Sequence, residues 1–207
     1  MLSLEGVKLW RRKRHLAGLL SSQLTAFSTG AEPLQAEACS LDTIQQEMER
    51  LPGGTRRLAV RLRLDLDPHW LWVVLTDYDG LSRFIPNLQS SRLLWRRANV
   101  VGLEQEGAQT FMGMRFKARV QLELTEHLDE RRLSFVMAKG DFRRFEGTWQ
   151  IGAEAGNTTL LYELTVQGCV GMPIGLIEQR LREDLAANLR AVQREAQQRA
   201  ASQPSSV

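Results

Sequence analysis

The chain has 207 residues, of which 43% are hydrophobic and 25% are charged, a composition that excludes wholesale disorder and suits one domain with extensions. No apolar run approaches the roughly 20 residues of a membrane span. The net charge of +3 belongs to residues 1–30, which hold five basic side chains against one acidic one, so the remainder is close to neutral.

A near-neutral body argues against nucleic acid as a partner, because a phosphate-binding face concentrates positive charge. The two cysteines, Cys39 and Cys169, are far apart and lack CxxC spacing. This usage fits a reducing compartment and gives no disulfide framework. We therefore expect a cytoplasmic protein without a nucleic-acid partner.

Residues 1–39 form a basic extension in which apolar side chains flank the cationic run WRRKRH, residues 10–15. The segment is either a solvated, flexible tail or a basic amphipathic helix that makes peripheral contact with an anionic membrane or a partner. We favour the flexible tail. Its apolar stretch is shorter than the core of a secretory signal, and its basic, acid-poor composition leaves organellar targeting open.

Residues 40–54 are predicted to form a short helix and a linker. Ser40 is placed to cap the helix. Three apolar residues share one helical face: Ile44, Met48 and Leu51. A proline followed by two glycines then ends the helix and begins the linker.

The main domain is predicted over residues 55–199. It begins with a half-buried strand from Arg56 to Leu66, in which apolar and charged residues alternate. Pro68 opens a helix that runs through Tyr78, and a second short helix covers Gly80 to Ile85.

The middle of the domain is rich in strands whose residues alternate between apolar and polar. Strands are expected at 88–96, at 99–109, over Thr110–Glu126, and around Leu133, Trp149 and Leu164. Their short, turn-rich connections make the sheet an antiparallel meander. A long amphipathic helix follows from Pro173 to Arg199, and residues 200–207 are expected to be a disordered tail.

These elements predict an α+β fold in which a curved antiparallel sheet wraps around the long C-terminal helix. A single sheet has one apolar face to cover, and this helix is the element long enough to cover it. A cavity remains wherever the facing side chains do not fill the space between sheet and helix.

The segment LDPHWLWVVLTDYDGLSRFIPN, residues 66–87, resembles the opening of the START-like (SRPBCC), helix-grip polyketide cyclase/dehydrase family, which includes the coenzyme Q-binding START proteins. Five residues match the family motif D-Y-x-x-L/Y-x-x-F-x-P: Asp77, Tyr78, Leu81, Phe84 and Pro86. The sequence Gly147-Thr148-Trp149 and the C-terminal helix also match, so the likeness spans residues 55–198. The resemblance implies a cavity for lipids, quinones, hormones or polyketides, in which a minority of members catalyse cyclisation or dehydration.

The sequence carries no common catalytic or metal-binding motif. The three histidines, His15, His69 and His127, are scattered and have no metal-ligand spacing. No phosphate-binding loop, dinucleotide-binding loop or nucleophile elbow occurs. We therefore predict no metal, no cofactor and no catalytic residues.

The residues predicted to line the cavity come from the inward faces of the strands, the long helix and the mouth. Phe84 and Ile85 are expected to form a rigid lid edge at the mouth. Gln105 is the polar residue best placed to fix a ligand carbonyl. Tyr162 is included, although we favour a core tyrosine whose hydroxyl bonds nearby. The other candidates are apolar: Met112, Met114, Phe116, Phe135, Met137, Phe145, Trp149, Ile177 and Leu181.

Apolar inward faces favour binding over catalysis, because acid–base chemistry needs polar groups in a dry cleft. We predict the binding or carriage of a small hydrophobic ligand of a lipid, isoprenoid-quinone or pigment-like class. One alternative is a cyclase- or dehydratase-type enzyme acting on a polyketide-like or aromatic substrate in the same cavity. Another is an interaction module that docks through its basic extension.

Overall fold

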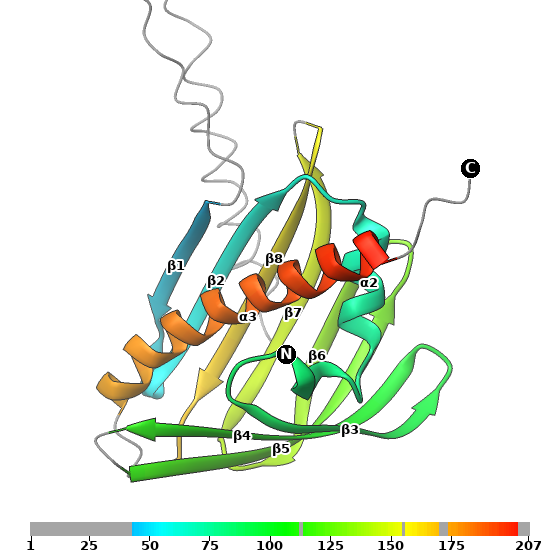
Figure 1. Ribbon diagram of the computed structural model, residues 1–207. Coiled ribbons are helices and arrows are strands. Elements are labelled where there is room, and N and C mark those ends of the chain that lie inside the picture. The colour runs from blue at the N-terminus through cyan, green and yellow to red at the C-terminus, as the bar shows by residue number, and fades with distance from the viewer. Residues whose placement is uncertain (1–42, 112–113, 155, 170–173, 203–207) are drawn as a thin grey trace, which may run out of the picture. The chain divides into compact units, whose positions relative to one another are not determined.

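The computed structural model describes residues 43–111, 114–154, 156–169 and 174–202 (Figure 1). The basic extension of residues 1–39, and with it the predicted membrane contact, lies outside these ranges. Among the helices within them, none combines the length and the apolar composition that a membrane span requires.

Eight strands of the described ranges form one antiparallel sheet, in the spatial order β1-β2-β8-β7-β6-β5-β4-β3. The strands are β1 (Ile44–Arg50), β2 (Thr55–Leu64), β3 (Leu88–Arg97), β4 (Val100–Phe111), β5 (Met114–His127), β6 (Arg132–Gly140), β7 (Arg144–Glu154) and β8 (Asn157–Gln167). The predicted meander is confirmed from β3 to β8, and β2 joins the sheet beside β8.

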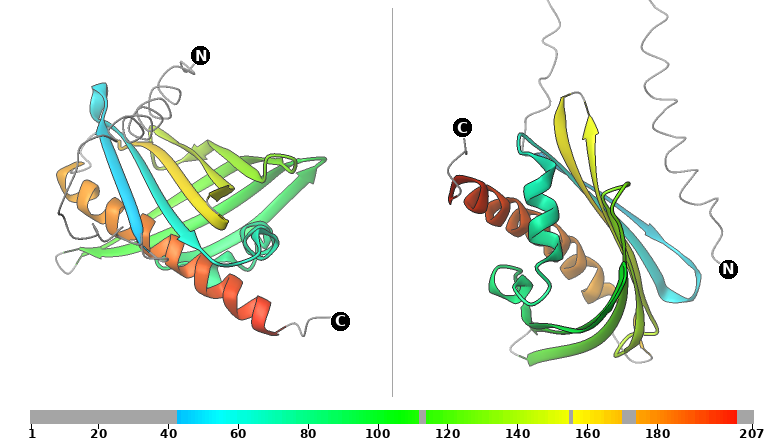
Figure 2. Two further views of the ribbon diagram at one scale, coloured as in Figure 1. Left: turned by 90° about the horizontal axis from the view of Figure 1, so that it is seen from above. Right: turned by 90° about the vertical axis from the view of Figure 1, so that its right-hand side faces the viewer.

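Two α-helices and two short 3-10 helices complete the described fold. They are η1 (Pro52–Gly54), α2 (Pro68–Thr76), η2 (Leu81–Arg83) and α3 (Ile174–Ser202). Figure 2 shows α2 and α3 on the concave side of a strongly curved sheet. The predicted α+β helix-grip architecture is therefore confirmed.

Strands β2 and β8 form the centre of the buried face because every second residue over most of each strand is a buried apolar one. Leu62 and Leu160 lie opposite each other in the pairing, and both are completely buried. The same alternation buries Leu58 and Leu164, which also face each other across the two strands. The sequence pattern thus determines which face of the sheet meets the helices.

The helix predicted within residues 40–54 is not formed, because Ile44–Arg50 is strand β1 and pairs with β2 along its whole length. Ile44 and Met48 pack against the core. Their spacing of four residues places them on one face of a helix and equally on one face of a strand. The backbone edge of β2 offers N–H and C=O groups that need partners, so the segment forms a strand and not a helix.

Two further boundaries differ from the prediction. The single strand expected over Thr110–Glu126 is two strands: its first two residues end β4, and β5 begins at Met114. The alternation continues through this hairpin without a break, which hid the turn. Helix α3 reaches Ser202, inside the tail of residues 200–207 expected to be disordered, because the two alanines before Ser202 are strong helix formers.

Ion pairs hold α3 at both of its ends. Near its first turns, Glu178 accepts hydrogen bonds from Arg56 at 2.5 Å and from Arg50 at 2.8 Å. In its last turns, Arg199 donates to Asp77 at 2.7 Å. The helix is thereby tied to β1 and β2 at one end and to the end of α2 at the other.

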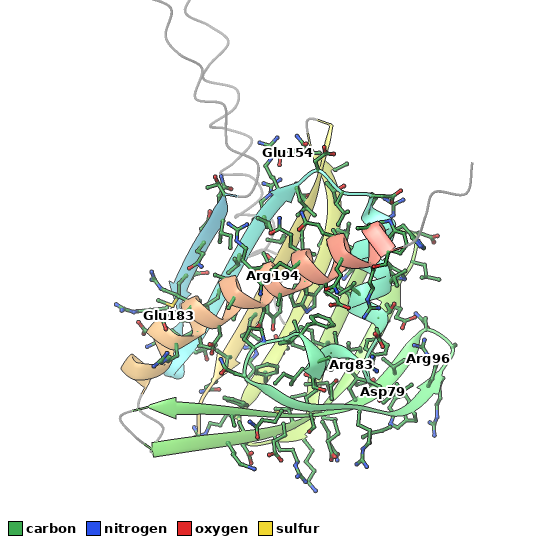
Figure 3. All side chains as sticks on the ribbon, in the orientation of Figure 1. Asp79, Arg83, Arg96, Glu154, Glu183 and Arg194 are labelled. Carbon is green, nitrogen blue, oxygen red and sulfur yellow. The ribbon has the colours of Figure 1, made fainter. Side chains whose placement is uncertain are left out.

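Between these ends, α3 turns an apolar stripe toward the sheet. The stripe is fully buried and consists of Leu185, Leu189, Val192 and Ala196. Figure 3 labels Glu183 and Arg194 on the same helix, and both are exposed. The helix is therefore amphipathic in place, as its sequence predicts.

Replacing Leu189 with Ala tests the assignment of this face. Leu189 is completely buried, so the Leu189→Ala variant should lose about 2–5 kcal/mol of unfolding free energy through lost transfer energy and a residual cavity. The exposed Arg194→Ala change is the matched control and should shift the unfolding free energy by no more than about 0.5 kcal/mol. Urea denaturation measures both, and equal losses would contradict the assignment.

The ion pairs of Glu178 predict a specific dependence of stability on pH. Hydrogen bonds from Arg50 and Arg56 lower the pKa of Glu178 from 4.5 to about 2. Because the folded-state pKa is depressed, the stabilisation is complete above about pH 4.5 and is lost as the pH falls toward about 2. The Glu178→Gln variant should therefore melt at a lower temperature than the unmodified protein at neutral pH, and this difference should shrink in acid.

The matched control for this experiment is Glu183→Gln on the same helix. Glu183 pairs with Arg180 at the surface, where such pairs contribute little. The melting temperature of the Glu183→Gln variant should equal that of the unmodified protein at every pH. A deficit in Glu178→Gln that does not change with pH would argue against the ion-pair assignment.

Candidate functional site

A cavity of about 640 Å³ lies between the concave face of the sheet, α3 and the segment that joins α2 to β3. This volume falls within the roughly 300–1,000 Å³ that is typical of small-molecule sites. Its aliphatic wall comes from α2, η2, four strands and α3: Leu75, Leu81, Leu103, Val120, Leu122, Leu124, Leu133, Leu164, Leu181, Leu185 and Val192. The apolar faces of sheet and helix thus surround a space that they do not fill.

Five aromatic side chains line the cavity in a continuous row, which we call the aromatic wall. The rings follow one another in the order Phe142, Phe145, Phe135, Tyr162 and Trp149, with centroid distances of 5.3, 5.7, 6.3 and 3.9 Å. The last two rings are parallel to within 5°. The other neighbouring rings are tilted against each other by 29–47°, so together the five offer a ligand a large, faceted apolar surface.

The sequence analysis missed one residue of the aromatic wall, Phe142. A glycine of β7 allows another ring of the wall, Phe135, to pack closely. Phe142 lies in the turn ahead of β7, so it falls outside the alternation of that strand. At Gly147, a Cβ atom would lie 2.7 Å from the Phe135 ring and 2.1 Å from a backbone oxygen of β8. The glycine therefore lets Phe135 lie close against β7.

The edge of the cavity between η2 and β3 is formed by Ile85 and Pro86. Phe84, which we predicted beside Ile85, is half-buried against the hydrophobic core and is not among the described residues that line the cavity. The backbone N–H groups of Phe84 and Ile85 both donate to the carbonyl of Leu81, the first residue of η2, and both side chains pack against the core, but only Ile85 is among the described residues that line the cavity. The predicted lid edge is thus corrected to Ile85 and Pro86.

Asn87 connects this edge to both α3 and β4. Its Nδ2 donates to Asp184 Oδ1 at 3.2 Å, and its carbonyl accepts a hydrogen bond from the N–H of Ala108 at 2.9 Å. Its φ of 62° is left-handed, a conformation that asparagine tolerates better than most residues. The edge is therefore held from two directions.

Gln105 lines the cavity as predicted, but its amide is already engaged. Its Nε2 donates to Ser91 Oγ at 3.1 Å, and Ser91 Oγ donates to the carbonyl of Tyr78 at 2.6 Å. The hydroxyl of Tyr78 donates to Glu126 at 2.7 Å. These three hydrogen bonds therefore connect β3, β4 and β5 to the segment that follows α2.

Tyr162 is buried, as expected for a core tyrosine, but no hydrogen bond between described residues involves its hydroxyl. Burial raises the pKa of Tyr162 above its ordinary value. Asn188 on α3 also lines the cavity, and its Oδ1 is buried without a partner. The sequence analysis missed Asn188, although its positions three after Leu185 and four before Val192 place it on the apolar stripe.

The remaining predicted residues divide into three groups. Phe135, Phe145, Trp149 and Leu181 line the cavity. Met137 is half-buried against the core and is not among the described lining residues. Met112 lies outside the described residues, as do the side chains of Met114, Phe116 and Ile177.

The D-Y-D-G sequence at residues 77–80 acts as a structural junction. Asp77 binds Arg199 of α3, and Asp79 Oδ1 accepts a hydrogen bond from the backbone N–H of Leu93 at 2.8 Å. A Cβ atom at Gly80 would lie 2.2 Å from the Asp77 carboxylate, so a side chain there would collide with it. Asp77, which matches the family motif, and Asp79 and Gly80, which occupy its variable positions, thus hold the cavity wall in place.

The charged residues of the lining are paired at the surface. Lys117 binds Glu106 at 2.8 Å, and Arg180 binds Glu183 at 3.2 Å. Neither histidine of the described ranges is in the lining. Within those ranges, no group of His, Cys, Asp and Glu side chains is arranged to hold a metal ion.

A family model described as polyketide cyclase/dehydrase and lipid transport matches residues 64–193. This range includes α2, the sheet from β3 to β8 and the part of α3 that lines the cavity. The match is to the family as a whole, so the coenzyme Q-binding subtype stays a prediction. Among curated proteins, no sequence matches.

Solved structures of several proteins are similar to this chain. A STAR-related lipid transfer protein from Xanthomonas axonopodis is 15% identical, with a TM-score of 0.64, over 74% of this chain and 93% of that one. The Zhui aromatase/cyclase from Streptomyces sp. R1128 is 15% identical, with a TM-score of 0.61, over 70% and 96%. A START superfamily protein from Mycobacterium smegmatis is 14% identical, with a TM-score of 0.57, over 69% and 97%. At these identities the likeness establishes the fold alone.

Truncating Phe84 and Ile85 separately tests the corrected edge of the cavity. Phe84→Ala should lower the unfolding free energy by about 1–3 kcal/mol, less than a fully buried Phe, and should leave the affinity for an apolar fluorescent probe unchanged. Ile85→Ala should weaken probe binding more than it lowers stability, because Ile85 lines the cavity. Melting curves and probe titrations measure both, and weaker binding in Phe84→Ala than in Ile85→Ala would restore Phe84 to the mouth.

Proposed function

We propose that this chain, which belongs to the polyketide cyclase/dehydrase and lipid transport family, binds and carries a small hydrophobic molecule. The observation that carries the proposal is a cavity of about 640 Å³ enclosed by aliphatic side chains and the aromatic wall. An apolar molecule in this space leaves water, and each 100 Å² of its surface so buried contributes about 2.5 kcal/mol.

The ligand belongs to a lipid, isoprenoid-quinone or pigment-like class. The aromatic wall supports this choice because its row of rings complements a planar ring system or an unsaturated chain. The aliphatic side chains of β5 and α3 complete the enclosure and suit a branched or linear hydrocarbon.

A cyclase- or dehydratase-type enzyme acting on a polyketide-like or aromatic substrate is the second candidate. The hydroxyl of Tyr162 and the amide of Asn188 favour it, because such chemistry requires polar groups inside an apolar cleft. Carriage is preferred because burial raises the pKa of Tyr162, which moves it away from the range near neutrality that suits proton transfer.

Native mass spectrometry of freshly purified protein, followed by solvent extraction, distinguishes the two candidates. A carrier releases a noncovalently bound apolar molecule, and the same molecule rebinds and is recovered unchanged. A cyclase or dehydratase returns a supplied polyketide-like substrate with the mass of one water removed or with a new ring. Conversion at catalytic turnover would replace carriage as the function.

Filling the cavity provides the mutational test. Ala118 lines the cavity, so the indole of Ala118→Trp should occupy the ligand's space and weaken apolar-probe binding at least about tenfold. Ala138→Trp, at an exposed position on β6, is the matched control and should bind the probe normally. Melting curves establish that both variants are folded. Retention of the co-purified molecule by both variants would refute binding in the cavity.

A further inference from the structure

The polar side chains of the cavity lining fall into two groups. Most are engaged with other parts of the protein: Tyr78 with Glu126, Asn87 with Asp184, Gln105 with Ser91, Lys117 with Glu106, Cys169 with the carbonyl of Asp141, and Arg180 with Glu183. Apart from the indole of Trp149, which stacks on Tyr162, two have no side-chain hydrogen bond within the described residues, namely Tyr162 and Asn188.

Tyr162 and Asn188 lie on opposite walls of the cavity. Tyr162 is on β8, where its ring is fixed against Trp149 at a centroid distance of 3.9 Å. Asn188 is on α3, which covers the concave face. Both residues project from rigid elements, so the positions of their polar groups are set by the fold.

The two residues are also remote from the basic side chains of the lining, Lys117 and Arg180. The charged lining residue nearest to Asn188 in sequence is the acidic Asp184, one helical turn before it. Asn188 is eight residues beyond Arg180 on α3, which corresponds to about 12 Å along the helix axis. Tyr162 is three strands away from Lys117 of β5, or roughly 14 Å across the sheet. A carboxylate held between Tyr162 and Asn188 would therefore be buried without a cationic partner among the described residues, which is strongly unfavourable.

A neutral group has no such penalty. A phenol hydroxyl donates or accepts a hydrogen bond, and an amide presents its donor or its acceptor according to which way it is turned. Because burial raises the pKa of Tyr162, its hydroxyl stays protonated and able to donate. A ligand oxygen near these residues would satisfy groups that otherwise remain unpaired in an apolar space.

We propose that Tyr162 and Asn188 form a polar recognition site inside the cavity, which binds a neutral carbonyl or hydroxyl group at the buried end of an otherwise apolar ligand. This inference rests on the proposed binding function and narrows it. The ligand enters with its neutral oxygen-bearing end first, and its hydrocarbon part extends along the aliphatic wall toward Ile85 and Leu181. Fatty acids with a free carboxylate are disfavoured in this orientation.

A series of molecules with equal chain length tests the proposal. The probes are 2-dodecanone, 1-dodecanol, dodecanoate and dodecane, each measured by displacement of an apolar fluorescent dye from the full-length protein. The unmodified protein should bind the ketone and the alcohol about three- to tenfold more tightly than the hydrocarbon, as one or two hydrogen bonds provide. It should also bind them more tightly than dodecanoate.

Three variants assign the preference to the two residues. Tyr162→Phe and Asn188→Leu should each lower the affinity for 2-dodecanone about three- to tenfold and leave the affinity for dodecane unchanged. Thr148→Val is the control, because it removes a hydroxyl that donates to Glu163 and lies outside the described cavity lining. It should lower the melting temperature without changing the order of ligand affinities. Melting curves of all three variants establish that they are folded.

Each outcome bears on a different claim. Equal binding of the four probes, or a preference that survives in both Tyr162→Phe and Asn188→Leu, overturns the polar recognition site while leaving hydrophobic binding intact. Tighter binding of dodecanoate than of the alcohol overturns the requirement for a neutral group. Failure of every probe to displace the dye counts against the proposed function itself.

Discussion

The attachment of α3 at its two ends is the constraint on which the rest of the structure depends. Glu178 binds Arg50 and Arg56 at one end, and Arg199 binds Asp77 at the other. A helix is nearly straight, whereas the sheet beneath it is strongly curved (Figure 2). A straight element fixed across a curved surface leaves space under its middle, and the cavity of about 640 Å³ occupies this space.

Several residues both build the cavity and face it. Asp77, Asp79 and Gly80 form a junction between α2, α3 and β3, and the polar chain from Gln105 to Tyr78 connects neighbouring strands while both of these residues line the cavity. Of the residues that match the family motif, Asp77 helps to hold the enclosure together, whereas Tyr78, Leu81 and Pro86 line it. Ligand preference depends on the aromatic wall and on the few polar groups that the enclosure leaves free, which explains how one fold serves both carriers and enzymes.

The sequence by itself determined the fold class and the inward face of most strands. A strand's side chains alternate with a period of two, so the apolar residues of β2, β5 and β8 identify their own buried face without reference to any neighbour. The apolar stripe of α3 likewise follows from the spacing of residues within that helix alone. Of the predicted cavity residues, those on regular strands and on α3 whose side chains are described are placed in the lining, except Met137, which packs against the core.

Only the tertiary structure decided what local periodicity leaves open. Ile44 and Met48 fit a helix and a strand equally well, and pairing with β2 makes the segment β1. Phe84 and Ile85 are adjacent in a turn that has no period, so the packing of the turn decides which of them reaches the cavity. Whether a polar side chain is engaged or free depends on partners far away in the sequence. Gln105 meets Ser91 on the neighbouring strand, whereas the Oδ1 of Asn188 has no partner among the described residues, because hydrogen bonds are made in space and sequence spacing does not record them.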